Sequence, residues 1–222
     1  MQNKIPKDIK NNYEFLSRMD KAYLHARWRL CPFLLIDKCL PQKGKIVDVG
    51  SGYGLLGHVI ARNQNRKVYG IDLSKKRVDI ARRSINGKKN LFFERKNVKD
   101  LKLGDCDGIV MSDFLHHISF KDQENLIRQA RGKLKNGGIL AIQDIDKKPK
   151  WKYAFAAGLD LILNGFPYLY YRRKENIKTM LERNGFQVEI VPADKGLPLP
   201  DILFICTKVS LPNIRQKHQM EN

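Results

Sequence analysis

The stretch Ile46-Val47-Asp48-Val49-Gly50-Ser51-Gly52-Tyr53-Gly54 decides the fold, because a short apolar run ends in three glycines at alternating positions. A second apolar run, Val68 to Ile71, ends in Asp72. A strand that leads through a glycine turn into a helix lets a ligand approach the backbone closely, and an acid after the next strand can accept hydrogen bonds from ribose hydroxyls. The pattern therefore predicts a site for a nucleotide-like ligand.

Short apolar strands alternate with helical segments along most of the chain. We expect helices over 12–40, 74–85, 123–134 and 176–183, and strands over 45–49, 67–71, 91–94, 108–111 and 139–143. This alternation predicts a Rossmann-like, doubly wound α/β fold with a mostly parallel sheet and helices on both faces. Two last strands, over 186–191 and 202–209, have no helix between them. They should therefore pair as an antiparallel C-terminal hairpin.

Taken in order, these motifs resemble the class I S-adenosylmethionine-dependent methyltransferases. The matching segments are Asp48 to Gly54, Gly70 to Ser74, Arg95 to Val98 and Asp107 to His117, together with the turn at 136–138 and the closing hairpin. The resemblance covers about residues 44–209. It implies that S-adenosyl-L-methionine is the cofactor and that the chain is a methyltransferase.

The resemblance also implies which residues bind the methyl donor. Gly50, Ser51 and Gly52 would lie against the methionine portion, with Asp48 ordering the turn and contacting the amino group. Asp72 would accept both ribose hydroxyls, because a carboxylate offers two adjacent acceptors. The full expected set is Asp48, Gly50, Ser51, Gly52, Tyr53, Gly54, Asp72, Leu73, Asn97, Val98, Asp113 and Phe114. Within it Leu73 would pack on adenine, and Asn97 stands where the family often has Asp.

Candidate catalytic groups follow the strands over 108–111 and 139–143. His116 is the first choice for a general base that manages the acceptor's proton, and His117 and Asp144 are further candidates at the same edge. Asp146 and four tyrosines could also face an acceptor, namely Tyr153, Tyr168, Tyr170 and Tyr171. Structural roles stay open: loop capping for Asp48, a hydrogen-bonded helix start for His116, and plain packing for the tyrosines.

A different class of enzyme also fits part of the pattern. Gly52, Gly54 and Gly57 satisfy the dinucleotide fingerprint, so an NAD(P)-dependent oxidoreductase is an alternative. An acid at Asp48 would repel a pyrophosphate, whereas a donor with an amino group and a sulfonium tolerates it. The helix-free hairpin at the end of the chain also favours the methyltransferase.

Charge and the apolar segment before the hairpin bear on the acceptor. The formal net charge is +19, with fourteen basic against four acidic residues over 61–102. Such a field favours an anionic partner, either RNA, an acidic acyl carrier protein or the surface of an anionic membrane. Residues 147–175 are apolar and aromatic with basic flanks, which favours O- or C-methylation of a small hydrophobic or carrier-bound acyl or polyketide-like acceptor from lipid or secondary metabolism. An RNA methyltransferase is the runner-up.

The domain organisation follows from the same segments. We expect an N-terminal helical lid over 1–43, a methyltransferase domain over 44–209 with a substrate-capping insertion at 147–175, and a flexible polar tail over 210–222. No apolar run reaches the roughly 18–20 residues of a membrane span, and the N-terminus lacks a secretory pattern. The four cysteines form no metal-binding cluster, so we expect no metal and a cytoplasmic protein with free thiols.

Overall fold

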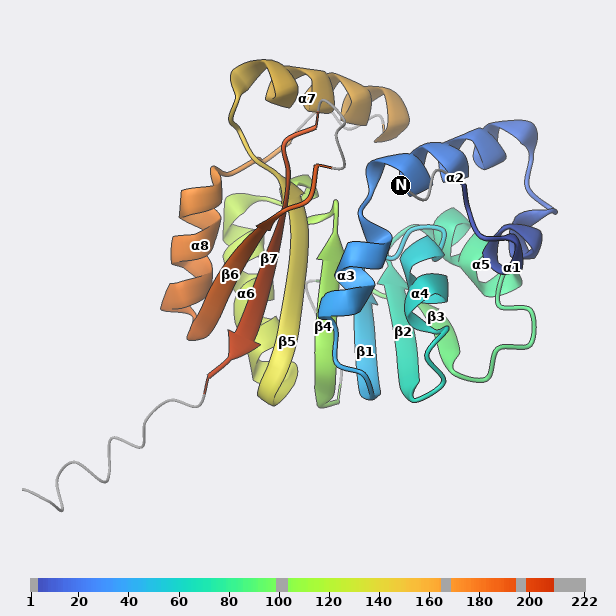
Figure 1. Cartoon of the computed structure of the whole chain (residues 1–222), viewed down its shortest axis with the longest axis horizontal. Coiled ribbons are helices and arrows are strands. Elements are labelled where there is room, and N and C mark those ends of the chain that lie inside the picture. Colours follow the sequence, from blue (N-terminus) through green and yellow to red (C-terminus); the bar gives the residue numbers. More distant parts are fainter. Residues whose placement is uncertain (1–3, 99–103, 165–168, 195–198, 210–222) are drawn as a thin grey trace, which may run out of the picture.

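A mixed seven-stranded sheet in the order β3-β2-β1-β4-β5-β7-β6 forms the centre of the computed structural model (Figure 1). The structure describes residues 4–98, 104–164, 169–194 and 199–209. The strands are β1 (Gly44–Val49), β2 (Arg66–Asp72), β3 (Leu91–Arg95), β4 (Cys106–Ser112), β5 (Leu134–Ile145), β6 (Phe186–Pro192) and β7 (Asp201–Lys208). β1 to β5 pair parallel, whereas β7 runs antiparallel to both of its neighbours, β5 and β6. The predicted fold class and the antiparallel hairpin are confirmed.

Helices cover both faces of this sheet (Figure 1). They are α1 (Lys7–Lys10), α2 (Arg18–Leu30), α3 (Phe33–Cys39), α4 (Leu55–Ile60), α5 (Lys75–Arg83), α6 (Phe120–Lys133), α7 (Lys150–Asn164) and α8 (Lys174–Arg183), with short 3₁₀ turns η1 (Asn11–Tyr13) and η2 (Leu115–His117). Side chains of β1 alternate between two cores, since Ile46 packs with α2 to α4 while Val47 and Val49 pack with α6 and α8. This period of two is what a strand covered on both faces requires.

The prediction of one helix over 12–40 is wrong. The segment contains η1, α2 and α3, and Cys31 between the last two has an extended backbone with ψ 137°. The reason is Pro32, because a proline disfavours helical geometry in the residue before it and cannot donate to the preceding turn. The break turns α3 back along the sheet and leaves α2 at the carboxyl end of the strands (Figure 1).

Strand β5 begins earlier than the sequence indicates. The turn expected at 136–138 belongs to the strand from Leu134 onward, and its pairing with β4 shifts register between Cys106 and Gly108. Gly137 has φ +73°, which a side chain would make costly. This register shift accommodates the residues over 135–138, so the predicted strand over 139–143 still pairs continuously with β4.

The insertion between β5 and the hairpin contains α7. The inner side of α7 forms a small separate core in which Ala156 packs with Ile145, Tyr171 and Leu199. Tyr168 and the tail over 210–222 lie outside the described residues, and the domain boundaries stay predictions. Within the described ranges no helix combines the length and the apolar character that crossing a bilayer needs. All four cysteines are free thiols, as expected.

Candidate active site

The glycine turn after β1 brings bare backbone to the edge of the sheet. Gly50, Gly52 and Gly54 have φ values of +76°, +55° and +85°, a region that other residues rarely adopt. A Cβ on Gly50 would lie 2.3 Å from the Phe114 ring, and one on Gly54 would lie 2.4 Å from Phe93. Gly50 therefore has no room for a side chain beside Phe114, and Gly54 serves the geometry of the turn and the start of α4.

Asp72, at the end of β2, is held by the turn itself. Its two carboxylate oxygens accept hydrogen bonds from the backbone N–H groups of Gly52, at 2.9 Å, and Ser74, at 2.8 Å. A carboxylate has about four lone-pair directions, so two acceptor positions remain for a ligand. The neighbouring Leu73 side chain is 58% exposed, which leaves an apolar surface beside this carboxylate.

Asp48 is a buried acid whose Oδ2 has no hydrogen-bond partner among the described residues. Only 2% of the residue is exposed, and burial together with the nearby Asp72 raises the pKa of its carboxyl to about 7. Ser51 Oγ is a second buried oxygen without a hydrogen-bond partner in the described part of the chain. Buried polar atoms are normally paired, so these two oxygens suit a ligand that brings N–H donors.

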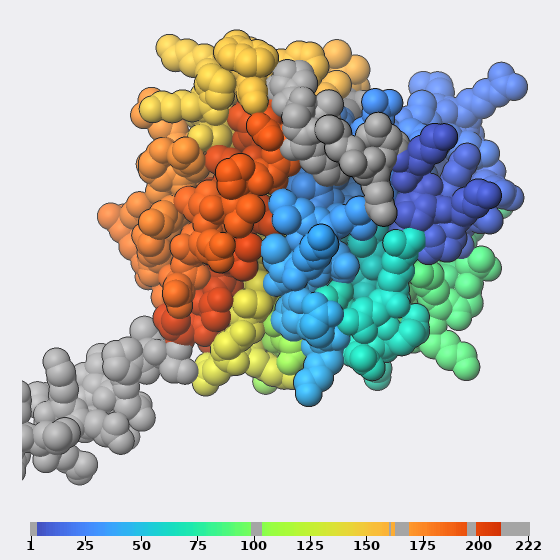
Figure 2. All heavy atoms as spheres, in the orientation of Figure 1, coloured from blue at the N-terminus to red at the C-terminus, as the bar shows by residue number. Residues whose placement is uncertain are grey.

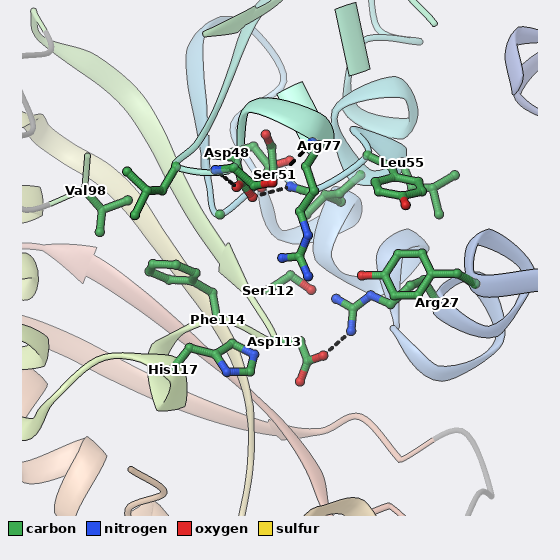
Figure 3. A pocket seen from close by; sticks show the side chains of 18 of the residues that line it. Arg27, Asp48, Ser51, Leu55, Arg77, Val98, Ser112, Asp113, Phe114 and His117 are labelled. Carbon is green, nitrogen blue, oxygen red and sulfur yellow. Dashed lines mark hydrogen bonds and ion pairs between the residues drawn. The ribbon is translucent and has the colours of Figure 1, made fainter. Parts of the chain in front are cut away.

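These groups open into one cavity of about 530 Å³ (Figure 3). Its lining includes the predicted Asp48, Gly50, Ser51, Gly52, Tyr53, Asp72, Leu73, Asn97, Val98, Asp113 and Phe114. Of the predicted donor-binding set only Gly54 is absent from the lining, and its part is conformational. Strands β1, β2 and β4 lie side by side and end at the same edge, which is why residues so far apart in the chain meet here.

The two adjacent histidines lie in different places. His117 lines the cavity, whereas His116 is fully buried, stacked on Tyr171 with ring centroids 4.3 Å apart. His116 Nδ1 contacts Asp144 Oδ1 at 2.6 Å, and Asp144 is itself 3% exposed. The geometry therefore does not support His116 or Asp144 as groups that touch an acceptor, because both are enclosed behind the cavity wall.

The other acceptor-facing candidates also have structural partners. Asp146 is buried and accepts a hydrogen bond from the Lys174 backbone N–H at 3.2 Å. Tyr153 packs edge-on against Tyr171 at 5.3 Å between ring centroids, and Tyr170 packs against Phe120. None of these described side chains lines the main cavity.

Helices α2, α3 and α5 provide lining residues that the sequence did not single out, although it predicted an N-terminal lid. Tyr23, Leu24 and Arg27 of α2 face the cavity from one side of that helix, joined by Phe33 of α3 and by Arg77 of α5. The spacing of 23, 24 and 27 on one helical face is a pattern that could have indicated a shared surface. The spacing does not indicate which strand this helix surface packs against.

Arg27 forms an ion pair with Asp113, at the end of β4 (Figure 3). Asp113 has φ +53°, a strained value for a residue with a side chain. Burial alone would raise the pKa of the Asp113 carboxyl, but Arg27 and then His116 outweigh it and hold that pKa at about 2. The ion pair therefore places fixed charges in the cavity lining and ties α2 to the end of β4.

A second link joins the N-terminal segment to the glycine turn. The Tyr53 hydroxyl donates to Asp20 Oδ1 at 2.6 Å, and the Tyr53 carbonyl accepts a hydrogen bond from the Tyr13 hydroxyl at 2.8 Å. The residues over 13–27 are thus held over the cavity from two strand ends. We call α2 and α7, which both lie beyond the carboxyl ends of the strands, the roof (Figure 1).

The order of the strands and the buried acids of the turn together define the class I S-adenosylmethionine-dependent methyltransferase fold and its donor site. The family described as methyltransferase domain matches residues 15–191, and the chain belongs to that family. The residues present fit the donor: Asp48 Oδ2 and Ser51 Oγ suit its ammonium, Asp72 its ribose hydroxyls and Leu73 its adenine. The dinucleotide alternative finds no such support.

Known proteins agree with this assignment. The chain is 26% identical over 156 residues to a ribosomal protein L11 methyltransferase of Dictyoglomus turgidum, covering 68% of the chain and 48% of that protein. It is 27% identical to a ubiquinone biosynthesis O-methyltransferase of Neisseria meningitidis, covering 52% of the chain and 50% of the relative. The chain thus spans about half the length of these curated relatives.

A solved structure shows the same fold. It is an O-methyltransferase family 2 protein of Planctomyces limnophilus in complex with apigenin, with a TM-score of 0.69 at 16% identity. The match covers 86% of this chain and 61% of that protein.

Proposed function

We propose that this chain transfers a methyl group from S-adenosyl-L-methionine to a small hydrophobic acceptor, free or carried on an acidic acyl carrier protein, at an oxygen or carbon atom. The observation that carries the proposal is the apolar part of the cavity lining. Tyr23, Leu24, Phe33 and Ile118 supply an apolar and aromatic surface there. Such a lining with few polar groups is typical of sites for small apolar ligands.

His117 is the group best placed to manage the acceptor's proton. When bound, the donor supplies an electrophilic methyl carbon on a sulfonium. For an oxygen acceptor, a C–O bond forms as the C–S bond breaks, and the acceptor's proton must leave. An imidazole at the cavity wall can take that proton, and Phe114 beside it limits the room in which the acceptor lies.

Relatives support the reaction type without naming the substrate. The Neisseria relative is named for O-methylation in ubiquinone biosynthesis, and the Planctomyces structure contains apigenin. We therefore favour an oxygen acceptor on a molecule of lipid or secondary metabolism, in a cytoplasmic enzyme.

An RNA acceptor remains the second candidate, and the net charge of +19 favours it. The two candidates differ in what surrounds the reacting methyl. An RNA methyltransferase needs an open basic groove, whereas Tyr23, Leu24 and Phe33 cover this cavity with apolar side chains.

A methyl-transfer assay with radiolabelled donor separates the candidates. The acceptors would be hydroxylated aromatic compounds, hydroxyacyl groups on a carrier protein, and total RNA. We expect label in the first or second class and none in RNA, with RNA failing to compete. Label in RNA with a steep salt dependence would contradict the proposal. Stabilisation against heating by NAD(H) but not by S-adenosylhomocysteine would contradict the donor assignment itself.

A further inference from the structure

The outward face of α7 is apolar although it is exposed. The exposed positions from residue 151 onward are Trp151, Ala154, Phe155, Gly158, Leu161 and Ile162. At 100° per residue they fall within one stripe, about 120° wide, along three turns of the helix. Trp151 is 63% exposed, Phe155 50% and Ile162 81%. A continuous group of large exposed apolar side chains is typical of a surface that binds another protein or a membrane.

The opposite side of α7 already has its partner within the chain. Ala156, Tyr153 and Ala157 pack against Tyr171 and Leu199 in the small core under the helix. The exposed stripe is therefore not the face by which α7 packs on this domain. Helix α7 itself lies at the outermost edge of the molecule beyond the carboxyl ends of the strands (Figures 1 and 2).

Basic side chains are exposed at both ends of the insertion that contains the stripe, and on α2. Lys148 and Lys150 are exposed at the start of α7, and Arg173 and Lys174 are exposed where the chain leaves the insertion. Arg18 and Arg29 are exposed on α2, which lies at the same edge of the molecule (Figure 1). An apolar stripe with Trp and Phe, accompanied by exposed Lys and Arg, is typical of helices that lie in the interface of an anionic bilayer.

We propose that the α7 stripe docks this protein on the surface of an anionic membrane, with α7 lying in the plane of the interface. An acidic carrier protein would match the basic residues but would leave Trp151, Phe155 and Ile162 facing a charged surface. A bilayer accommodates both, because its headgroups attract the basic residues and its acyl region accepts the apolar ones.

Docking at this edge would bring the lipid phase close to the reaction cavity. Leu30 of α2 packs on the same small core as α7. A small cavity of about 30 Å³ between α2 and α7, lined by Leu159 and Leu199, shares Arg27 and Asp113 with the main cavity. The inference goes beyond the proposed reaction and does not depend on which atom is methylated.

The test is co-sedimentation of the full chain with vesicles of phosphatidylcholine alone and of phosphatidylcholine with phosphatidylglycerol. We expect pelleting with the anionic vesicles that weakens as salt is raised. The triple variant Trp151→Ala/Phe155→Ala/Ile162→Ala should partition at least about tenfold less, since its membrane-facing area is removed. Phe92→Ala, which removes an exposed aromatic on β3, is the matched control and should pellet like the parent protein.

A spectroscopic readout tests the orientation independently of folding. Trp28 is 3% exposed and Trp151 is 63% exposed, so a blue shift of emission on adding anionic vesicles should come from Trp151. Trp151→Phe should still pellet without that shift. Equal pelleting of the parent and the triple variant, no pelleting at all, or a dimer or carrier-protein complex that depends on the stripe would overturn the proposal.

Discussion

The donor half of the cavity and its roof are built in opposite ways. The donor half consists of the turn over 50–54 and the ends of β1 and β2, where backbone N–H groups and short side chains do the positioning. The roof consists of α2 and α7, and α2 reaches the site through long side chains such as Arg27 and Tyr23. The difference teaches that the expected donor side is built from local backbone geometry, whereas the proposed acceptor side depends on segments that tertiary packing brings together.

The largest expected effect concerns the acceptor side. His117→Ala should lower turnover by about 10²–10⁴-fold, the usual contribution of a positioned acid–base group, while leaving donor affinity unchanged. Steady-state methyl transfer and calorimetric titration with S-adenosylhomocysteine would measure the two effects. His25→Ala, an exposed histidine on α2, is the control. Undiminished turnover in His117→Ala would remove this residue from the reaction.

His116 provides the contrast one residue away. His116→Ala should destabilise the fold by about 3 kcal/mol, because it leaves the buried Asp144 carboxylate without its imidazole partner. Chemical denaturation would measure the free energy of unfolding. In the double variant His116→Ala/Asp144→Ala part of this loss should be recovered, since no buried charge remains. A stable His116→Ala protein with reduced turnover would instead restore His116 as a catalytic candidate.

On the donor side, Asp72→Ala should weaken binding of S-adenosylhomocysteine by at least about 100-fold. Each hydrogen bond to a charged acceptor contributes about 1.5–3 kcal/mol, and two would be lost with the ribose. Isothermal titration would measure the affinity, with Asp79→Ala on the exposed side of α5 as control. A variant that unfolds at a lower temperature than the parent but binds as tightly would show that Asp72 serves the turn alone.

The smallest effect is a pH dependence from Asp48. Its pKa is about 7 in the folded protein against a usual 3.8, so protonation stabilises the fold as pH falls from about 7 toward 3.8. The ionised form suits the donor's ammonium, so affinity for S-adenosylhomocysteine should rise with pH, by at most about tenfold per unit, and level off near 7.

Two substitutions sharpen this point. Asp48→Asn should flatten the pH profile of donor binding. Asp201→Asn should leave it intact, although burial also raises the pKa of Asp201 to about 7, because Asp201 is bonded to Gln143 behind the cavity. If donor affinity still rose with pH in Asp48→Asn, the titrating group would be a residue other than Asp48.

Apart from Gly54, the expected donor-binding residues line one cavity for a reason that the sequence already contains. Asp48 to Gly54 and Asp72 lie at strand ends, and parallel strands with short connections can place such ends only at one edge. At the roof the sequence indicated a helical lid but not its shape. The prediction treated 12–40 as one helix and overlooked Pro32, whose effect on Cys31 turns the chain and sends α2 over the cavity.

The adjacent histidines also show that a sequence pattern does not indicate how side chains pack in the fold. A sequence places His116 and His117 equally near the end of β4, and only the packing of Tyr171 on the His116 ring shows which of them is enclosed. The sequence by itself determined the sheet, the glycine turn and the donor acids, because these depend on local backbone geometry and strand order. Tertiary structure alone decided which histidine faces the cavity, that Arg27 pairs with Asp113, and that α7 turns its apolar stripe outward, since each depends on contacts between segments far apart in the chain.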